Sequence, residues 1–335
     1  MTDGLSSEGF DLHFPQVYEP QLASGVLRSI ADDFQVEEQL GYEPEGTGEH
    51  CFIWLRKREA NTEWVAEQLA QFSGIRKRDV NYAGRKDRHA VTIQWFSLWL
   101  PGQPDPDFSQ LDLPGVEVLK VYRHNRKLRR GSHQGNQFVI KIREIAGLGS
   151  LTGAALTSAI DDRLAAIREQ GFPNYFGPQR FGHDGQNLHQ AQQLITALLE
   201  SGASSRRRGR RGDIYVSAAR SYLFNRVLAA HVEAGSWQQL DERGRPETGP
   251  LPGLVRKPHP AAAWEQKVLE AATGQLAEHW VSCFAQIGMK ASRRPLAVLP
   301  SDLSWRWQDQ VLQVSFGLPT GSYATALLEQ IFVLQ

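Results

Sequence analysis

Residues 61–100 have the sequence NTEWVAEQLAQFSGIRKRDVNYAGRKDRHAVTIQWFSLWL, in which a helix pattern is followed by a strand pattern. Asn61 is a favourable N-cap, apolar side chains then recur at helical spacing, and Gly74 is a stop. Alternating apolar side chains predict a strand over residues 92–100. Residues 81–90 are therefore predicted to form a loop between two ordered elements, and loops of this kind commonly hold functional groups.

The pattern outside this stretch divides the chain into three parts. The first part is mainly β, with extended patterns over residues 26–38, 51–55, 116–121 and 138–142. The middle part is mainly helical, with helices predicted over residues 151–170, 187–200, 215–233 and 262–286. The β pattern returns at about Arg294, with a strand at residues 312–316 and a short helix predicted over 320–330. We expect an α+β fold in which a helical domain is inserted into a sheet domain.

The composition is that of a soluble globular protein, since 41% of the 335 residues are hydrophobic and 22% are charged. The first residues lack the pattern of a secretory signal, and no apolar run reaches the roughly 18 to 20 residues that cross a bilayer. Two cysteines provide neither a disulfide framework nor a zinc set. We therefore expect a cytoplasmic protein with no membrane association and no metal site.

The net charge is zero, but the basic residues are clustered. The clusters are Arg76, Lys77, Arg78, Arg85, Lys86 and Arg88; then Arg123, Arg126, Lys127, Arg129 and Arg130; then Arg206, Arg207, Arg208, Arg210 and Arg211. Phosphates respond to the local field, so a neutral chain with three such patches is able to bind a polyanion. The alternative is that the runs are solvated loops, and the charge pattern favours neither interpretation.

One carboxylate, Asp87, lies among three basic side chains in the loop Gly84-Arg85-Lys86-Asp87-Arg88. Neighbouring cations favour the ionised form of a carboxylate, and an ionised carboxylate is able to act as a covalent nucleophile. The charge pattern alone favours a simpler interpretation, in which Asp87 forms an ion pair within the loop.

Residues 174–182, NYFGPQRFG, combine aromatic rings, an arginine, an amide and glycines. Such a segment could stack on unpaired bases, but the pattern slightly favours a turn whose aromatic rings fill the core. Asp33-Phe34 and Gly135-Asn136-Gln137-Phe138 are weaker motifs of the same ambiguous kind.

At these residues the sequence resembles the TruD family of tRNA pseudouridine synthases. Residues 83–94, AGRKDRHAVTIQ, are similar to the catalytic motif of the family, and residues 174–182 are similar to its second signature. Three further segments agree in the expected order, namely Asp33-Phe34-x-Val36, Gly135-Asn136-x-Phe138 and Leu318-Pro319-x-Gly321-Ser322-Tyr323-Ala324-Thr325.

The resemblance implies the pseudouridine-synthase fold, with a curved and mainly antiparallel central sheet and an inserted, mostly helical TRUD domain. It places the catalytic domain at residues 1–170 and 298–335 and the insert at residues 171–297. The implied substrate is uridine 13 in the D arm of tRNA, which is extruded into the pocket. No cofactor, no metal and no obligate protein partner are implied, and we expect a monomer.

The resemblance also assigns roles to individual residues. Asp87 matches the catalytic aspartate, and Arg28 and Lys86 are candidates to support it. Residues matching positions that contact the target nucleotide are Phe34, Asn136, Phe138 and Tyr323. Phe138 is expected to stack on the uracil, and Tyr323 stands where phenylalanine is expected. The expected RNA-binding patches are Arg126, Lys127, Arg129, Arg130, Arg206, Arg207 and Arg208.

Two other functions are compatible with parts of this pattern. The same basic surfaces would serve a non-catalytic RNA-binding protein or RNA chaperone, which would not need Asp87. A hydrolase acting on sugars would need a second carboxylate within about 10 Å of Asp87. The sequence offers no obvious partner, and Glu37 is the one carboxylate left open.

Overall fold

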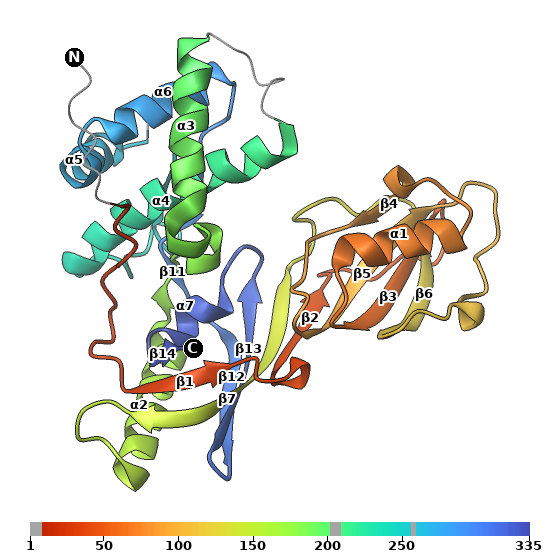
Figure 1. Cartoon of the computed structure of the whole chain (residues 1–335), viewed down its shortest axis with the longest axis horizontal. Coiled ribbons are helices and arrows are strands. Elements are labelled where there is room, and N and C mark those ends of the chain that lie inside the picture. The colour runs from red at the N-terminus through yellow and green to blue at the C-terminus, as the bar shows by residue number, and fades with distance from the viewer. Residues whose placement is uncertain (1–8, 202–208, 256–258) are drawn as a thin grey trace. The chain divides into compact units, whose positions relative to one another are not determined.

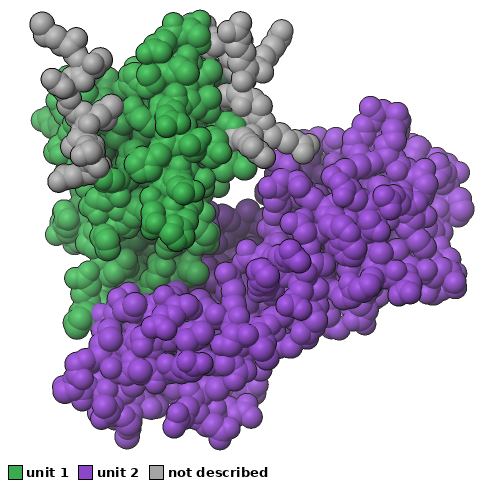
Figure 2. Space-filling model, in the orientation of Figure 1, with its two compact units in different colours: residues 1–20, 169–299, 325–330 green, residues 21–168, 300–324, 331–335 purple. Residues whose placement is uncertain are grey.

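The computed structural model of the chain describes residues 9–201, 209–255 and 259–335, and it consists of two compact units. Unit 1 comprises residues 1–20, 169–299 and 325–330, and unit 2 comprises residues 21–168, 300–324 and 331–335 (Figure 2). Over the described ranges, no helix is both long and apolar enough to cross a bilayer.

Unit 2 is built on a ten-stranded sheet with the order β12-β13-β7-β2-β5-β3-β6 (Figure 1). Off this path, β4 pairs with β5, and β1 pairs with both β7 and β14. The pairs β2–β5 and β1–β14 are parallel and the others are antiparallel. The strands are β1 (Ala23–Leu27), β2 (Phe34–Gln39), β3 (His50–Arg58), β4 (Val80–Tyr82), β5 (Val91–Trp99), β6 (Val116–His124), β7 (Gly135–Gly147), β12 (Ser301–Gln308), β13 (Val311–Pro319) and β14 (Phe332–Leu334).

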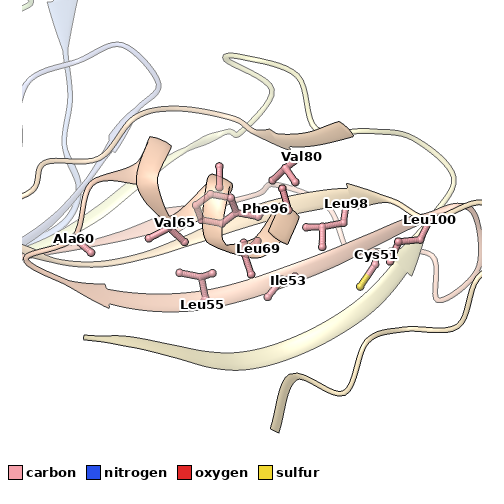
Figure 3. Packing of buried hydrophobic residues seen from close by; sticks show 12 residues of the cluster. Cys51, Ile53, Leu55, Ala60, Val65, Leu69, Val80, Phe96, Leu98 and Leu100 are labelled. Carbon is pink, nitrogen blue, oxygen red and sulfur yellow. The ribbon is translucent and has the colours of Figure 1, made fainter. Parts of the chain in front are cut away.

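Helix α1 (Thr62–Phe72) confirms the helix predicted after Asn61. The Asn61 side chain accepts a hydrogen bond from the Glu63 N–H at 2.8 Å, which is the expected N-cap. The buried face of α1 includes Val65 and Leu69 and packs on inward side chains of β3 and β5 such as Phe96 (Figure 3). This core covers one face of strands β3 and β5. The loop between α1 and β5 is therefore flanked by two packed elements.

Helix α2 (Gly153–Gln170) contacts strand β12 through a carboxylate and a guanidinium group. Asp161 Oδ1 accepts hydrogen bonds from the indole N–H groups of Trp305 at 2.7 Å and Trp307 at 2.9 Å. The Arg168 guanidinium lies 5.3 Å from the Trp305 ring centroid. Two of the tryptophans in this chain therefore join a helix to a strand.

Unit 1 is mainly helical, as the middle of the sequence predicts. Its helices are α3 (Gln186–Glu200), α4 (Gly209–Glu233), α5 (Ala262–Thr273), α6 (Leu276–Gln286) and the short α7 (Ala324–Leu328), whose first residue belongs to unit 2. Two small antiparallel pairs accompany them, namely β8 (Phe172–Pro173) with β11 (Ala297–Val298) and β9 (Thr248–Leu251) with β10 (Ser292–Pro295).

The segment 174–182 forms part of the core of unit 1. Tyr175, Phe176 and Phe181 are all buried. Asn225 exchanges two hydrogen bonds with the backbone of Phe176, at 2.9 and 3.0 Å. These contacts support the interpretation of the segment as a turn whose rings fill the core.

The end of the chain differs from the sequence prediction. A helix over residues 320–330 was expected, but α7 spans only Ala324–Leu328 and residues 320–323 form a turn. The chain then continues into β14, which pairs in parallel with β1. The partner of this strand is about 300 residues earlier in the chain, so no local pattern predicts the pairing.

Replacing Leu69 with alanine tests the α1 core. Because Leu69 is fully buried, we expect the variant to lower the free energy of unfolding by about 2–5 kcal/mol. The measurement is denaturant unfolding followed by circular dichroism. Gln71→Ala, on the exposed side of the same helix, is the matched control and should change stability by less than about 0.5 kcal/mol. Equal stabilities of the two variants would contradict the packing.

Candidate active site

A buried ammonium group holds the backbone of the loop that contains Asp87. Lys57 of β3 is fully buried, and its Nζ donates hydrogen bonds to the carbonyl oxygens of Ala60 at 2.8 Å and Asp87 at 3.0 Å. Burial lowers the pKa of Lys57 to about 8, and the nearby Asp87 carboxylate partly opposes this effect. The backbone of Asp87 is thus attached to a central strand of the sheet.

Two further buried side chains hold the start of the same loop. Gln94 of β5 donates from Nε2 to the Gly84 carbonyl oxygen at 3.2 Å and accepts at Oε1 from the Thr62 hydroxyl at 3.0 Å. Thr62, the first residue of α1, accepts from the Lys86 N–H at 3.1 Å. Gln94 is fully buried and Thr62 is 2% exposed. Helix α1 and strand β5 therefore fix the loop through its backbone, and none of these contacts involves the Asp87 side chain.

Asp87 forms an ion pair with Arg28, which follows β1. The Arg28 Nη2 to Asp87 Oδ2 distance is 2.8 Å, and the two side chains are 34% and 56% exposed. Arg28 holds a left-handed φ of 60°, which is uncommon for a residue with a side chain. Its guanidinium carbon lies 4.1 Å from the centroid of the Phe34 ring. Arg28 therefore contacts Asp87, as the sequence analysis expected, and leaves the carboxylate accessible.

Lys86 does not pair with Asp87. Its Nζ lies 2.8 Å from Oε2 of Glu38, and the two side chains are 7% and 0% exposed. The other oxygen of Glu38 accepts from the Trp95 N–H at 3.3 Å. Arg85 pairs with Glu63. Lys86 was a candidate to support Asp87, and the structure pairs its ammonium group with Glu38, a carboxylate distant in the sequence.

Two of the predicted nucleotide-binding rings are in contact. Phe34 of β2 and Phe138 of β7 lie on one face of the sheet with ring centroids 6.2 Å apart. Phe316 of β13 stacks on Phe138 with a centroid distance of 5.4 Å and an interplanar angle of 24°. Phe34 and Phe138 are only 3% and 7% exposed. The rings of Phe34, Phe138 and Phe316 form a continuous apolar surface, which we call the apolar floor. Arg28 contacts both the Phe34 ring of this floor and the Asp87 carboxylate.

Asn136 lies two residues before Phe138 on β7, and Tyr323 lies in the turn that follows β13. Asn136 is opposite Glu38 in the β2–β7 pairing, and its Oδ1 is buried without a hydrogen-bond partner among the described residues. Tyr323 is partly exposed in the turn after β13, whose last residue, Pro319, pairs with Gly135. The structure thus brings Asn136 next to the buried ion pair, with an acceptor that the described chain does not satisfy.

The contacts of Lys57 and Glu38 were not predicted from the sequence. Lys57 follows Ile53 and Leu55 on the inward face of β3, so a lysine in the alternating apolar position was a detectable signal. Glu38 carried no such signal, because its partner is 48 residues away.

The loop between β6 and β7 carries Arg126, Lys127, Arg129 and Arg130, all of them exposed. None of the four has a carboxylate partner within the described ranges. Arg206, Arg207 and Arg208 lie outside the described residues.

The structure disfavours a two-carboxylate hydrolase. Glu37 alternates with Glu38 along β2, so it points to the face of the sheet opposite Phe34. Its carboxylate accepts a hydrogen bond from Gln39 at 3.2 Å. Glu38 is buried and already paired with Lys86. Among the described residues, no cluster of three or more His, Cys, Asp or Glu side chains suits a metal ion.

Comparisons with known proteins point to one family. The sequence model of the family described as tRNA pseudouridine synthase D (TruD) matches residues 17–203 and 238–331. The curated tRNA pseudouridine synthase D of Cellvibrio japonicus is 41% identical over 329 residues, covering 97% of this chain and 94% of the relative. The protein of the same name from Hydrogenovibrio crunogenus is 39% identical over 352 residues, covering 96% of each chain.

A solved structure from Methanosarcina mazei that carries the TruD name is similar in fold. It superposes with a TM-score of 0.68 at 20% identity and covers 95% of each chain. The mixed sheet-and-helix architecture is therefore that of the solved structure. The family model and the curated relatives together extend over nearly the whole sequence, and the chain belongs to the TruD family of tRNA pseudouridine synthases.

Proposed function

We propose that this enzyme isomerises uridine 13 in the D arm of tRNA to pseudouridine, with Asp87 as the nucleophile. The observation that carries the proposal is the Asp87 carboxylate itself. It is more than half exposed, it is paired with Arg28, and its backbone is held by the buried Lys57. The curated relatives named above bear the name of this activity.

The reaction needs an ionised carboxylate and no cofactor. The N1–C1′ bond of the uridine breaks, the uracil turns, C5 bonds to C1′, and the proton lost from C5 is balanced by one gained at N1. Asp87 contributes either by attack at C1′ or by removing a sugar proton at the start of a glycal route. Arg28 is paired with the carboxylate that both routes use.

The target uridine lies inside folded RNA and has to be extruded, and the apolar floor offsets the loss of its neighbours. Phe138, Phe34 and Tyr323 provide rings for this purpose. The unsatisfied Oδ1 of Asn136 is an acceptor of the kind that the N3–H of uracil requires. Phe138 is nearly buried, so this role requires the pocket to open when RNA binds.

We further propose that residues 171–297 form a domain inserted into the catalytic domain of residues 1–170 and 298–335, and that the central sheet is curved. The long middle stretch of unit 1, residues 169–299, supports the insertion, and unit 1 also includes residues 1–20 and 325–330 from the proposed catalytic domain.

Asp87→Asn tests the nucleophile. We expect loss of pseudouridine formation, because the amide cannot act as an anionic nucleophile, with tRNA affinity retained within a few-fold. Tritium release from tRNA labelled at C5 of uridine measures the reaction, and filter binding measures affinity. Asp107→Asn, at an exposed carboxylate that caps the short helix before β6, is the matched control, because asparagine is also a favourable N-cap.

The same assay tests which position of the tRNA is modified, and it distinguishes the enzyme from the non-catalytic RNA-binding protein. A tRNA transcript with cytidine at position 13 should release no tritium with the wild-type enzyme. Modification elsewhere in that transcript would contradict the assigned position. Wild-type protein that binds many tRNAs and releases tritium from none would instead be the non-catalytic RNA-binding protein.

Lys57→Met tests whether the buried ammonium group positions the loop that contains Asp87. Without the two carbonyl contacts, Asp87 should shift and turnover should fall roughly 10- to 100-fold, with tRNA affinity retained. Lys267→Met, on the exposed side of α5, is the control. An unchanged turnover number would mean that Lys57 does not position the loop.

The pH dependence of the free energy of unfolding is an independent test of the buried Lys57 ammonium group. Its pKa is about 8 in the folded protein and 10.5 ordinarily, so the unfolded chain binds more protons between these values. This difference makes stability rise with pH over that window. The rise should be smaller for Lys57→Met than for the wild type. Parallel curves would show that the ammonium group is not desolvated.

Phe138→Ala tests the stacking floor. We expect a loss of about 1–3 kcal/mol in transition-state stabilisation, measured as the single-turnover rate at several tRNA concentrations. Phe138→Leu preserves most of the buried volume and removes the ring, so it separates stacking from packing. If Phe138→Leu reacts at the wild-type rate, the ring does not stack on the uracil.

A further inference from the structure

The face of the sheet opposite α1 carries a row of aromatic side chains. In the strand register, Trp54 of β3 pairs with Trp95 of β5 on one side and with Lys120 of β6 on the other. The next row on the same face pairs Phe52 with Tyr122. We call Trp54, Trp95, Tyr122 and Lys120 the aromatic face.

The rings of the aromatic face are arranged in series. The centroids of Trp54 and Trp95 are 6.0 Å apart with an interplanar angle of 22°, and those of Trp95 and Tyr122 are 6.1 Å apart. The Lys120 Nζ lies 5.2 Å from the Trp54 ring centroid. Tyr122 is 38% exposed, whereas Trp95 is 8% exposed. The buried tryptophan therefore supports the exposed tyrosine at one end of the series.

The basic loop between β6 and β7 is attached to this face. Leu128, at its centre, is 1% exposed and belongs to the same apolar cluster as Phe52 and Trp95. Its N–H donates to the Ser97 hydroxyl of β5 at 3.0 Å. A leucine between charged residues thus fixes the position of the cations on either side of it.

The loop also joins the aromatic face to the candidate active site. The Gly131 N–H donates to the Ala83 carbonyl oxygen at 2.8 Å, and Ala83 directly precedes the loop of Asp87. Asp87 lies on the side of the sheet that carries Lys57, which is opposite the aromatic face. The basic loop contacts segments on both sides, so it connects the two faces of the sheet. An RNA strand that leaves the active site would follow these cations around the edge of the sheet.

The cations around the aromatic face are not neutralised. Within the described part of the chain, no carboxylate pairs with Lys120, Arg126, Lys127, Arg129 or Arg130. By contrast, Arg56 on the same face pairs with Glu117 at 2.7 Å. Unpaired cations beside exposed aromatic rings are complementary to a phosphate backbone with an unpaired base.

We propose that the aromatic face is a second RNA site, which binds an unpaired nucleotide outside the target position. The base stacks on Tyr122 and the edge of Trp54, and its phosphates contact Lys120 and the basic loop. Cations without carboxylate partners beside a stacking ring match the regular phosphates and bases of a nucleic acid strand, so the combination favours RNA over a protein surface. This proposal rests on the function proposed above, in that the RNA is the substrate tRNA.

The test measures RNA binding alone, with full-length protein carrying Asp87→Asn so that no turnover occurs. The probes are a tRNA transcript and a single-stranded octauridylate, followed by fluorescence anisotropy. Tyr122→Ala should weaken octauridylate binding roughly 5- to 100-fold, and Tyr122→Phe should retain it. Trp264→Ala, at a ring of similar exposure (39%) in α5, is the control and should bind as the parent does.

Two further measurements do not depend on the Tyr122 variants. Lys120→Gln should reduce the slope of log Kd against log salt by about 0.7, as expected for one lost phosphate contact on a single strand. Photocrosslinking of 5-bromouridine octanucleotide should label a peptide that contains Tyr122 or Trp54.

Affinities within twofold of the parent for Tyr122→Ala and Lys120→Gln, with crosslinks elsewhere, would overturn the proposal and leave the aromatic face to a protein partner. Failure of the proposed function is a different result. In that case wild-type protein would form no pseudouridine, whatever the variants at Tyr122 do to binding.

Discussion

A buried ammonium group bound to two backbone carbonyl oxygens determines where Asp87 lies. Removing a lysine from water is costly, and the lowered pKa of Lys57 reflects that cost. The two carbonyl contacts offset part of it, and the position of the group is set by β3, which is paired on both edges. A loop held in this way keeps its backbone fixed while the carboxylate stays exposed. Precise positioning of this kind is what a reaction at a single sugar carbon requires.

The strand β3 has different partners on its two faces. On one face, Ile53 and Leu55 pack under α1, and Lys57 continues the same row toward the loop of Asp87. On the other face, Phe52 and Trp54 pack with Trp95 and receive Leu128 of the basic loop. The alternation of a single strand therefore supports both the proposed catalytic loop and the proposed RNA-binding loop. A slip of one residue in its register would exchange the two faces and disrupt both sites.

What the sequence could predict follows from the range of the interactions involved. Helix α1 was predictable because its N-cap and its apolar spacing are local features. The partner of Lys86 was not, because Asp87 is adjacent in the sequence whereas Glu38 becomes a neighbour only when β2 pairs with β5. The parallel β1–β14 pair and the aromatic face depend on strand register in the same way. Motif resemblance located Asp87 and offered Arg28 and Lys86 as candidates to support it. Only the folded chain shows that Arg28 is the one in contact with the carboxylate.

The distribution of ion pairs explains how a chain with no net charge could serve a polyanionic substrate. Near Asp87 three cations are paired within the chain, since Arg85 pairs with Glu63, Lys86 with Glu38, and Arg28 with Asp87, whereas the exposed Arg88 has no carboxylate partner among the described residues. Those pairs fix geometry and leave little charge for phosphates. In the β6–β7 loop the described cations have no such partners, so their field is available to RNA. Paired cations would thus shape the site for chemistry, and unpaired ones would hold the strand. It follows that salt should weaken binding through the second group and leave the geometry around Asp87 largely unchanged.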